Sequence, residues 1–133
     1  MSKLIDKLAW IIIQDGKLLT VRSKGKTLFY LPGGKREPGE SDEQALIREI
    51  REELSVELLP DSIRYADTFV GPADGKADDV SVQLTCYFAD FSGELKPDAE
   101  IEELRYLSSA DEAVFSKAAW IAAEWLKEKS LIH

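Results

Sequence analysis

The sequence predicts an α/β domain in which a mixed β-sheet lies between helices. Two observations lead to this prediction. Short apolar segments typical of strands occur at residues 8–13, 18–22, 63–70 and 80–91. Two longer segments, residues 41–54 and 109–129, instead repeat their apolar side chains at helical spacing. A sheet packed between helices is the simplest layering for this alternation.

The N-terminal part reads as a hairpin followed by a turn and a short strand. Residues 8–13 are a strongly apolar strand, and Asp15-Gly16 is a hairpin signal. Residues 18–22 return as the second strand, and residues 23–26 make a polar turn. A short apolar strand at residues 28–30 then leads into a glycine-containing loop.

The segment after the first helix predicts further strands and a closing helix. Leu59-Pro60-Asp61 breaks the helical pattern. Strands are expected at residues 63–70, 80–91 and 104–107. A polar loop, residues 71–79, separates the first two, and Ser109 with Glu112 fits a capping box that opens the closing helix. No repeat or linker divides the chain, so we expect one domain over residues 1–133.

The first helix is predicted from its cap and its buried stripe. Ser41, with Gln44 three residues on, fits a capping box that satisfies free amide groups at a helix start. Leu46, Ile50 and Leu54 recur every four residues and form the stripe that packs on the core. The helix is therefore expected to begin after Ser41 and to end near Leu54.

Three glutamates on this helix are expected to border the core. On a helical wheel Glu49 and Glu53 lie beside the apolar stripe, Glu52 lies slightly further round, and Arg48 and Arg51 point away. Carboxylates held near a core need a partner, and a divalent cation between them would supply one. The alternative is a solvent-exposed helix stabilised by pairs such as Arg48 with Glu52.

The loop before the helix favours the metal-binding interpretation. Leu31-Pro32-Gly33-Gly34 follows the short strand, and adjacent glycines let the backbone approach a metal or ligand closely. A second turn, Pro38-Gly39, delivers Glu40 to the helix start. Loop and helix together form a device suited to divalent cations.

Residues 34–56 resemble the signature of the Nudix hydrolases. Gly34 is followed by five residues and Glu40, and seven more residues lead to Arg48-Glu49. The pattern continues with an aliphatic residue and one unrestricted residue, then with Glu52-Glu53. After two further positions it ends at the aliphatic Val56. One position departs, because Ser55 stands where the family has glycine. The resemblance implies a Nudix α/β/α sandwich with a mixed sheet between helices.

The resemblance also implies an activity, which is hydrolysis of a nucleoside diphosphate linked to another moiety. Mg²⁺ is the cofactor that it implies, and Mn²⁺ suits the same ligands. Glu49, Glu52 and Glu53 would bind the metal, with Glu53 the most indispensable and Glu49 either a ligand or the water-activating base. The Gly33 carbonyl would add a backbone ligand, and Arg48 would orient the glutamates.

Other residues receive supporting roles from the same resemblance. Gly34 and Glu40 would be structural, with Glu40 steadying the loop against the helix. A late glutamate often adds a base or ligand in this family, and Glu100 and Glu103 are preferred here over Glu102. The alternative for each late glutamate is a charged loop before a strand.

The substrate is predicted only by class. Short members of the family often convert nucleoside triphosphates, including oxidised ones, to the monophosphate and pyrophosphate, which is the leading interpretation. Pro72 leaves an ADP-ribose or nucleotide-sugar pyrophosphatase as an alternative. Arg22, Phe29 and Tyr30 are the expected substrate-binding residues, although Phe29 suits a strand core equally well. A non-catalytic module that binds a nucleotide or protein is the alternative from another class.

Composition limits the remaining possibilities. The 133 residues are 44% hydrophobic and 32% charged, which argues against disorder. A net charge of −8 argues against binding polymeric nucleic acid. No apolar run suggests a membrane span, and the single cysteine, Cys86, suits a core position. We expect a cytoplasmic monomer or homodimer, and assign no catalysis to His133, a solvated end.

Overall fold

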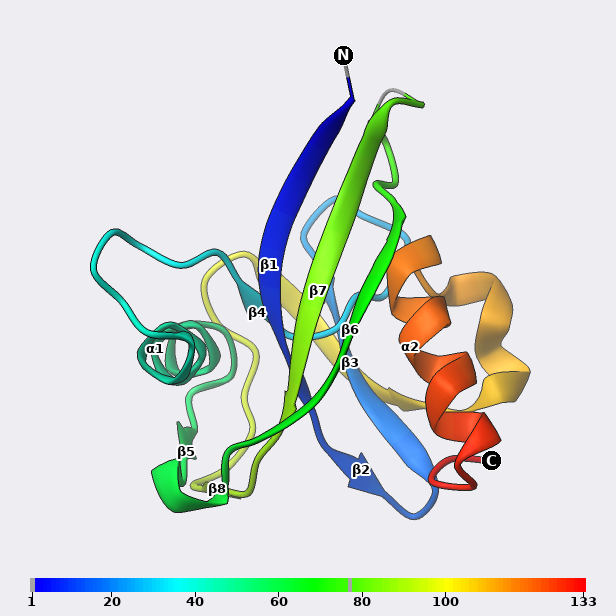
Figure 1. Ribbon diagram of the computed structural model, residues 1–133. Coiled ribbons are helices and arrows are strands. Elements are labelled where there is room, and N and C mark those ends of the chain that lie inside the picture. The colour runs from blue at the N-terminus through cyan, green and yellow to red at the C-terminus, as the bar shows by residue number, and fades with distance from the viewer. Residues whose placement is uncertain (1, 77) are drawn as a thin grey trace.

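The computed structural model describes residues 2–76 and 78–133 and shows a mixed four-stranded sheet between two helices (Figure 1). The strand order is β4-β1-β7-β6. β1 (Lys3–Ile11) runs parallel to β7 (Val80–Phe88) and antiparallel to β4 (Gly33–Gly34). β6 (Arg64–Pro72) pairs antiparallel with β7 and forms the far edge. The predicted α/β class is therefore confirmed.

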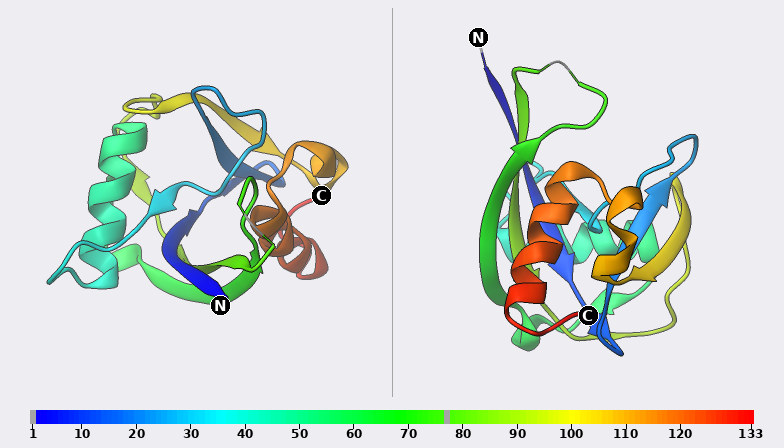
Figure 2. Two further views of the ribbon diagram at one scale, coloured as in Figure 1. Left: turned by 90° about the horizontal axis from the view of Figure 1, so that it is seen from above. Right: turned by 90° about the vertical axis from the view of Figure 1, so that its right-hand side faces the viewer.

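Two smaller sheets complete the strands. β3 (Lys17–Ser23) pairs with β2 (Ile13–Gln14) on one side and with β9 (Ile101–Leu107) on the other. A two-stranded sheet joins β5 (Glu57–Leu58) to β8 (Phe91–Ser92). β3 and β9 lie behind the large sheet in the view of Figure 1. Seen from above in Figure 2, the two larger sheets face each other across the interior of the domain.

The helices lie on opposite sides of the large sheet (Figure 1). α1 (Asp42–Leu54) follows the glycine loop, and α2 (Lys117–Glu128) packs against β6 near the end of the chain. Two short 3₁₀ helices, η1 (Pro60–Ser62) and η2 (Ser109–Val114), lie between these elements. This arrangement places α1 beside β4 and leaves the first turn of α2 near the loop between β6 and β7.

Alternation along β1 divides the core into two clusters. Leu8 and Trp10 face α1, whereas Ala9 and Ile11 face α2. The Trp10 indole N–H donates to the Ala89 carbonyl at 2.9 Å, so this buried polar group is satisfied. The fully buried side chains of α1 pack into the first cluster: Ala45, Leu46, Ile50 and Leu54. The predicted stripe of the first helix is therefore confirmed.

The hairpin prediction is also confirmed. Asp15 and Gly16 have φ values of 54° and 74°, as a tight two-residue turn requires. The His133 backbone N–H donates to the Gly16 carbonyl at 2.9 Å, and Ser109 N–H donates to the His133 carbonyl at 2.8 Å. His133 is exposed, as expected of a solvated end, but its backbone is docked on the hairpin.

The predicted bounds of several strands were wrong, among them those of β1 and β7. β1 starts at Lys3 and not at residue 8, because its polar first half pairs along β7 from Lys3 opposite Val80. β7 ends at Phe88 and not at residue 91, because the chain turns there and β8 pairs separately with β5. In both places backbone pairing across the sheet decides the bounds, and hydrophobicity does not.

The single closing helix predicted over residues 109–129 was also wrong. Ser108, not Ser109, caps η2, and its partner in the capping box is Asp111. Phe115 is extended, and its neighbours hydrogen-bond to Phe29, so the helix is interrupted. Ser116 then caps α2 by accepting from Ala119 N–H at 3.2 Å.

The caps of α1 match the sequence. Ser41 accepts from Gln44 N–H at 3.1 Å, and Gln44 returns a bond to Ser41 N–H at 3.0 Å. At the other end Ser55 is left-handed, with φ 64° and ψ 22°. A glycine adopts this conformation without the Cβ clash that a serine has.

We therefore expect Ser55→Gly to raise the free energy of unfolding by roughly 1 kcal/mol, because it relieves this strain. Urea unfolding followed by circular dichroism measures the change. Ser55→Ala is the matched control, since it keeps the Cβ and should bring no gain. An equal gain from both variants would contradict the explanation.

Candidate functional site

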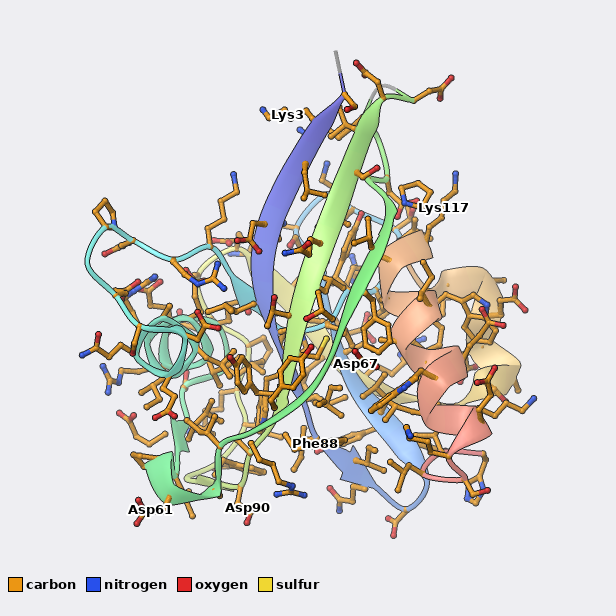
Figure 3. The ribbon with its side chains drawn as sticks, in the orientation of Figure 1. Lys3, Asp61, Asp67, Phe88, Asp90 and Lys117 are labelled. Atoms are coloured by element: carbon orange, nitrogen blue, oxygen red, sulfur yellow. The ribbon has the colours of Figure 1, made fainter. Side chains whose placement is uncertain are left out.

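A cavity of about 530 Å³ lies beside β4, between the large sheet and the β3 sheet. Its walls come from β1, β7, β3, the loop before β4, α1 and the start of α2. Lys3 and Lys117 lie toward this end of the molecule, and Asp61 and Asp90 lie at the opposite end (Figure 3). A volume of this size accommodates a small ligand such as a nucleotide.

The Glu53 carboxylate is the most unusual group in the cavity wall. Glu53 is only 8% exposed, and its Oε1 accepts from Gly33 N–H at 3.0 Å. Burial raises its pKa to about 8, and the nearby Glu49 and Glu100 carboxylates act in the same direction. The Gly33 N–H and Lys7 oppose this shift without cancelling it. The site therefore holds a carboxylate that lacks a full positive counter-charge.

Arg48 ties the loop to the helix beside this carboxylate. Its guanidinium donates to Glu40 at 2.7 and 2.8 Å, to Glu49 at 2.8 Å and to the Lys35 carbonyl at 3.1 Å. Glu40 in turn accepts from Glu37 N–H at 2.7 Å. The wheel-based expectation that Arg48 points away was wrong, because the loop folds back to meet it.

The two glycines of the loop allow close contact on both sides. Gly33 has φ 147°, and a side chain there would collide with the Leu8 carbonyl of β1. A side chain at Gly34 would collide with the Glu49 carboxylate. The Leu8 backbone cannot move aside, so the loop can lie against β1 only because Gly33 lacks a Cβ, whereas a side chain at Gly34 would displace the Glu49 carboxylate.

Glu52 does not share this environment. Its side chain is 54% exposed, and its carboxylate lies 3.6 Å from the Arg48 guanidinium. The expectation that Glu52 borders the core with Glu49 and Glu53 was therefore wrong. Across residues 2–76 and 78–133, no three acidic, histidine or cysteine side chains already form a metal-binding group.

Glu100 and Glu103, the preferred late glutamates, have different surroundings. Glu100 lines the cavity, but Glu103 lies within β9 and accepts from Arg22 at 3.1 Å and Arg105 at 2.6 Å. The two arginines also lie over the Phe29 ring, 6.0 and 5.0 Å from its centroid. Glu103 is therefore paired within the protein and lies in a strand, not in a charged loop.

The three expected substrate-binding residues are not gathered in one place. Phe29 is 3% exposed and belongs to the core, so its ring is not available to a base. Arg22 pairs with Glu102 and Glu103 and does not line the cavity. Tyr30 does line it.

Lys7 and Asp74 are among the polar residues of the cavity wall that the sequence interpretation missed. Lys7 shares the inward face of β1 with Ile5 and Ala9, so a lysine interrupting an apolar face was the available signal. Its pKa is lowered, first by burial and then by Lys35. Asp74 belongs to the β6–β7 loop, which carried no signal beyond its turn residues.

The donor set suits a hard divalent cation. Glu49, Glu53 and Glu100 line one cavity, and carboxylate oxygens are ligands that hard divalent cations prefer. Glu49 is held by Arg48, so binding would draw its carboxylate toward Glu53. These residues fit a metal without forming its site in advance.

Comparison with known proteins agrees with this geometry. The NUDIX domain family model matches residues 7–129. The chain belongs to the NUDIX family. The predicted family is thereby confirmed, and most of the chain, including both larger sheets and both α-helices, lies in the matched region.

Individual relatives are similar in sequence or in structure. The CTP pyrophosphohydrolase of Escherichia coli K12 is 46% identical over 59 residues, which are 41% of this chain and 44% of that protein. A MutT NUDIX hydrolase from Burkholderia pseudomallei has a TM-score of 0.76 at 26% identity, covering 92% of this chain and 98% of its own. The E. coli ORF135 protein has a TM-score of 0.63 at 29% identity, with 95% and 92% covered.

These similarities bear on two further predictions. The predicted enzyme class, a hydrolase of phosphoanhydrides, agrees with the hydrolase and pyrophosphohydrolase names of the relatives. Neither of the two α-helices in the described part of the chain combines the length and hydrophobicity that a membrane span requires.

The Glu40–Arg48 pair predicts a specific loss of stability in acid. The Arg48 guanidinium, together with the Glu37 N–H, lowers the pKa of Glu40 from 4.5 to about 2. A lowered folded-state pKa contributes stability above about pH 4.5, and this contribution is lost as the pH falls toward 2. We expect Glu40→Gln to make the free energy of unfolding fall less steeply over this interval.

Urea titrations at several pH values between 2 and 6 measure that slope. Glu43→Gln is the matched control, because Glu43 is an exposed carboxylate at the start of α1. Its slope should follow the unmodified protein. Identical slopes for Glu40→Gln and the unmodified protein would show that the pair contributes nothing.

Proposed function

We propose that this protein is a Mg²⁺-dependent hydrolase that converts a nucleoside triphosphate, oxidised forms included, to the monophosphate and pyrophosphate. The observation that supports it best is the buried Glu53 carboxylate, which faces a nucleotide-sized cavity together with Glu49 and Glu100. Three carboxylates in one cavity suit a cation-bridged anionic substrate.

In this proposal each residue of the site has a specific role in binding the metal or activating water. Glu53 is the central metal ligand, and Glu49 is a second ligand or the base that accepts the proton of the attacking water. Glu100 is the late glutamate that completes the set, and the Gly33 carbonyl adds a backbone oxygen. Arg48 holds Glu49 in place through their 2.8 Å contact. Glu52, being exposed, is an outer ligand at most in this arrangement.

Bound Mg²⁺, or Mn²⁺ in its place, neutralises phosphate charge and lowers the pKa of a coordinated water. The reaction then forms one bond from the water oxygen to phosphorus and breaks one phosphoanhydride bond. Lys7 and Lys35 line the same cavity and place positive charge near the phosphates. Their ammonium groups favour both the polyanionic substrate and the pyrophosphate that leaves.

The choice of a nucleoside triphosphate has independent support. The name of the E. coli relative specifies CTP, and its similarity covers 59 residues of this chain. An ADP-ribose or nucleotide-sugar pyrophosphatase is the second candidate, since Pro72, which suggested it, lines the cavity. A non-catalytic binding module is disfavoured, because no glutamate of the signature is replaced. For either hydrolase the partner is a small nucleotide, and we further propose a cytoplasmic monomer or homodimer.

A nucleotide panel tests the proposal. We expect Mg²⁺-dependent release of pyrophosphate from at least one nucleoside triphosphate, and EDTA should abolish it. The measurement is chromatographic detection of monophosphate and pyrophosphate, with ADP-ribose and a nucleotide sugar included. Monophosphate from only the latter two would favour the second candidate, and no turnover of any substrate would favour a binding module.

Glu53→Gln tests the metal role directly. The change preserves shape and removes the ligand charge, so kcat should fall on the order of 10²-fold or more while the fold survives. Mg²⁺ should raise the Tm of the unmodified protein but not that of the variant. Glu43→Gln on the same helix is the control and should behave like the unmodified protein. Near-normal turnover by Glu53→Gln would show that the site is wrongly assigned.

A further inference from the structure

The far end of the cavity differs chemically from the end that holds the glutamates. Ile5, Val82 and Leu84 form one wall, from β1 and β7, and Tyr30 contributes from the loop before β4. Val82 and Leu84 are 8% and 7% exposed, so these apolar side chains are only just accessible from the cavity. Such a slot between apolar and aromatic side chains suits a flat, uncharged ring.

One carboxylate lies at this end, where Lys76 of the β6–β7 loop also lines the cavity. Asp74, in the β6–β7 loop, lines the cavity, and its Oδ2 accepts from Lys117 N–H at 2.9 Å. Lys117 is the first residue of α2 and is labelled in Figure 3, and Figure 2 shows the loop close to that turn. The bond to the helix fixes the carboxylate by one oxygen.

The second oxygen of Asp74 remains an acceptor. Within residues 2–76 and 78–133, no donor forms a hydrogen bond with Oδ1. The carboxylate lines the same cavity as Tyr30, whose pKa is raised first by burial and then by the Asp74 charge. An acceptor beside an aromatic ring at the mouth of an apolar slot is suited to the edge of a nucleobase.

We infer that this end of the cavity binds the nucleobase and that Asp74 selects bases that present an amino group. The inference rests on the proposed function, which places the phosphates at the glutamate end and therefore the base at the other. Cytosine, adenine and guanine each carry an exocyclic amino donor. Uracil and thymine present a carbonyl oxygen at the corresponding position, which a carboxylate repels.

CTP and UTP provide the sharpest comparison, because they differ only at the 4-position and the adjacent ring nitrogen. We expect kcat/KM for CTP to exceed that for UTP by about tenfold or more, since an unmatched buried polar group discriminates strongly. Asp74→Asn is nearly isosteric, and its amide oxygen can still accept from Lys117 N–H. Its amide nitrogen would then donate to the uracil carbonyl.

The Asp74→Asn variant should therefore keep turnover and lower the ratio of kcat/KM for CTP to that for UTP by at least about tenfold. Asp78→Asn is the matched control, because Asp78 belongs to the same loop, is exposed and does not line the cavity. Its ratio should equal that of the unmodified protein. An unchanged ratio in Asp74→Asn, or a preference of the unmodified protein for UTP, would overturn the inference.

A binding measurement distinguishes failure of this inference from failure of the proposed function. If the unmodified protein hydrolyses no triphosphate, the proposed function fails, and calorimetric titration with CMP and UMP decides the base site alone. Tighter binding of CMP than of UMP, lost in Asp74→Asn, supports the assignment. Equal affinities, or a CMP preference that survives the substitution, would refute it.

Discussion

The buried carboxylate of Glu53 is the constraint on which the arrangement of the site depends. A carboxylate that is 8% exposed loses most of its hydration, and one hydrogen bond from Gly33 N–H does not replace it. This loss of hydration raises the pKa of Glu53 to about 8. The fold tolerates this group because a separate apolar stripe holds α1 in place. In the proposed function, the carboxylate without a positive partner binds a cation.

The glycine loop follows from the same constraint. For the Gly33 N–H to reach Glu53, the loop must pass between β1 and α1, where a side chain at position 33 would collide with the Leu8 carbonyl. The next glycine, Gly34, leaves room for the Glu49 carboxylate. Arg48 then closes the loop from outside by pairing with Glu40 and Glu49. The conformation of the loop at Gly33 and its attachment at Glu40 thus follow from contacts within the protein, independently of any ligand.

Local patterns in the sequence predicted the parts of the molecule that local contacts determine. The cap at Ser41, the buried stripe of α1 and the hairpin at Asp15-Gly16 depend on residues a few positions apart, and all were correct. The break at Phe115 could not be predicted in this way, because it depends on hydrogen bonds to Phe29, 86 positions away in the chain. A contact between residues so far apart in the chain depends on the overall topology, which local sequence patterns do not specify.

The same distinction applies to the site. The signature predicted that Glu49 and Glu53 would lie together, since four residues along one helix guarantee it. It could not separate Glu100 from Glu103. The Glu103 carboxylate pairs with Arg22, opposite it on β3, and Arg105, two residues along β9. A sequence pattern cannot reveal which charged side chain already has a partner across a sheet.

The topology also explains why one cavity has two chemically different ends. Parallel pairing brings β1 beside β7, so Ile5 and Lys7 share a wall with the apolar side chains of β7. β4 joins the other edge of β1 only at Leu8 and Ala9, which leaves the earlier part of that edge open beside the glutamates. α1 and α2 flank the sheet on opposite sides, so Glu49 and Glu53 come from one helix, and the Asp74 tether lies at the start of the other. In the proposed function, the sheet that holds the two helices apart would therefore separate the phosphate end of the cavity from the base end.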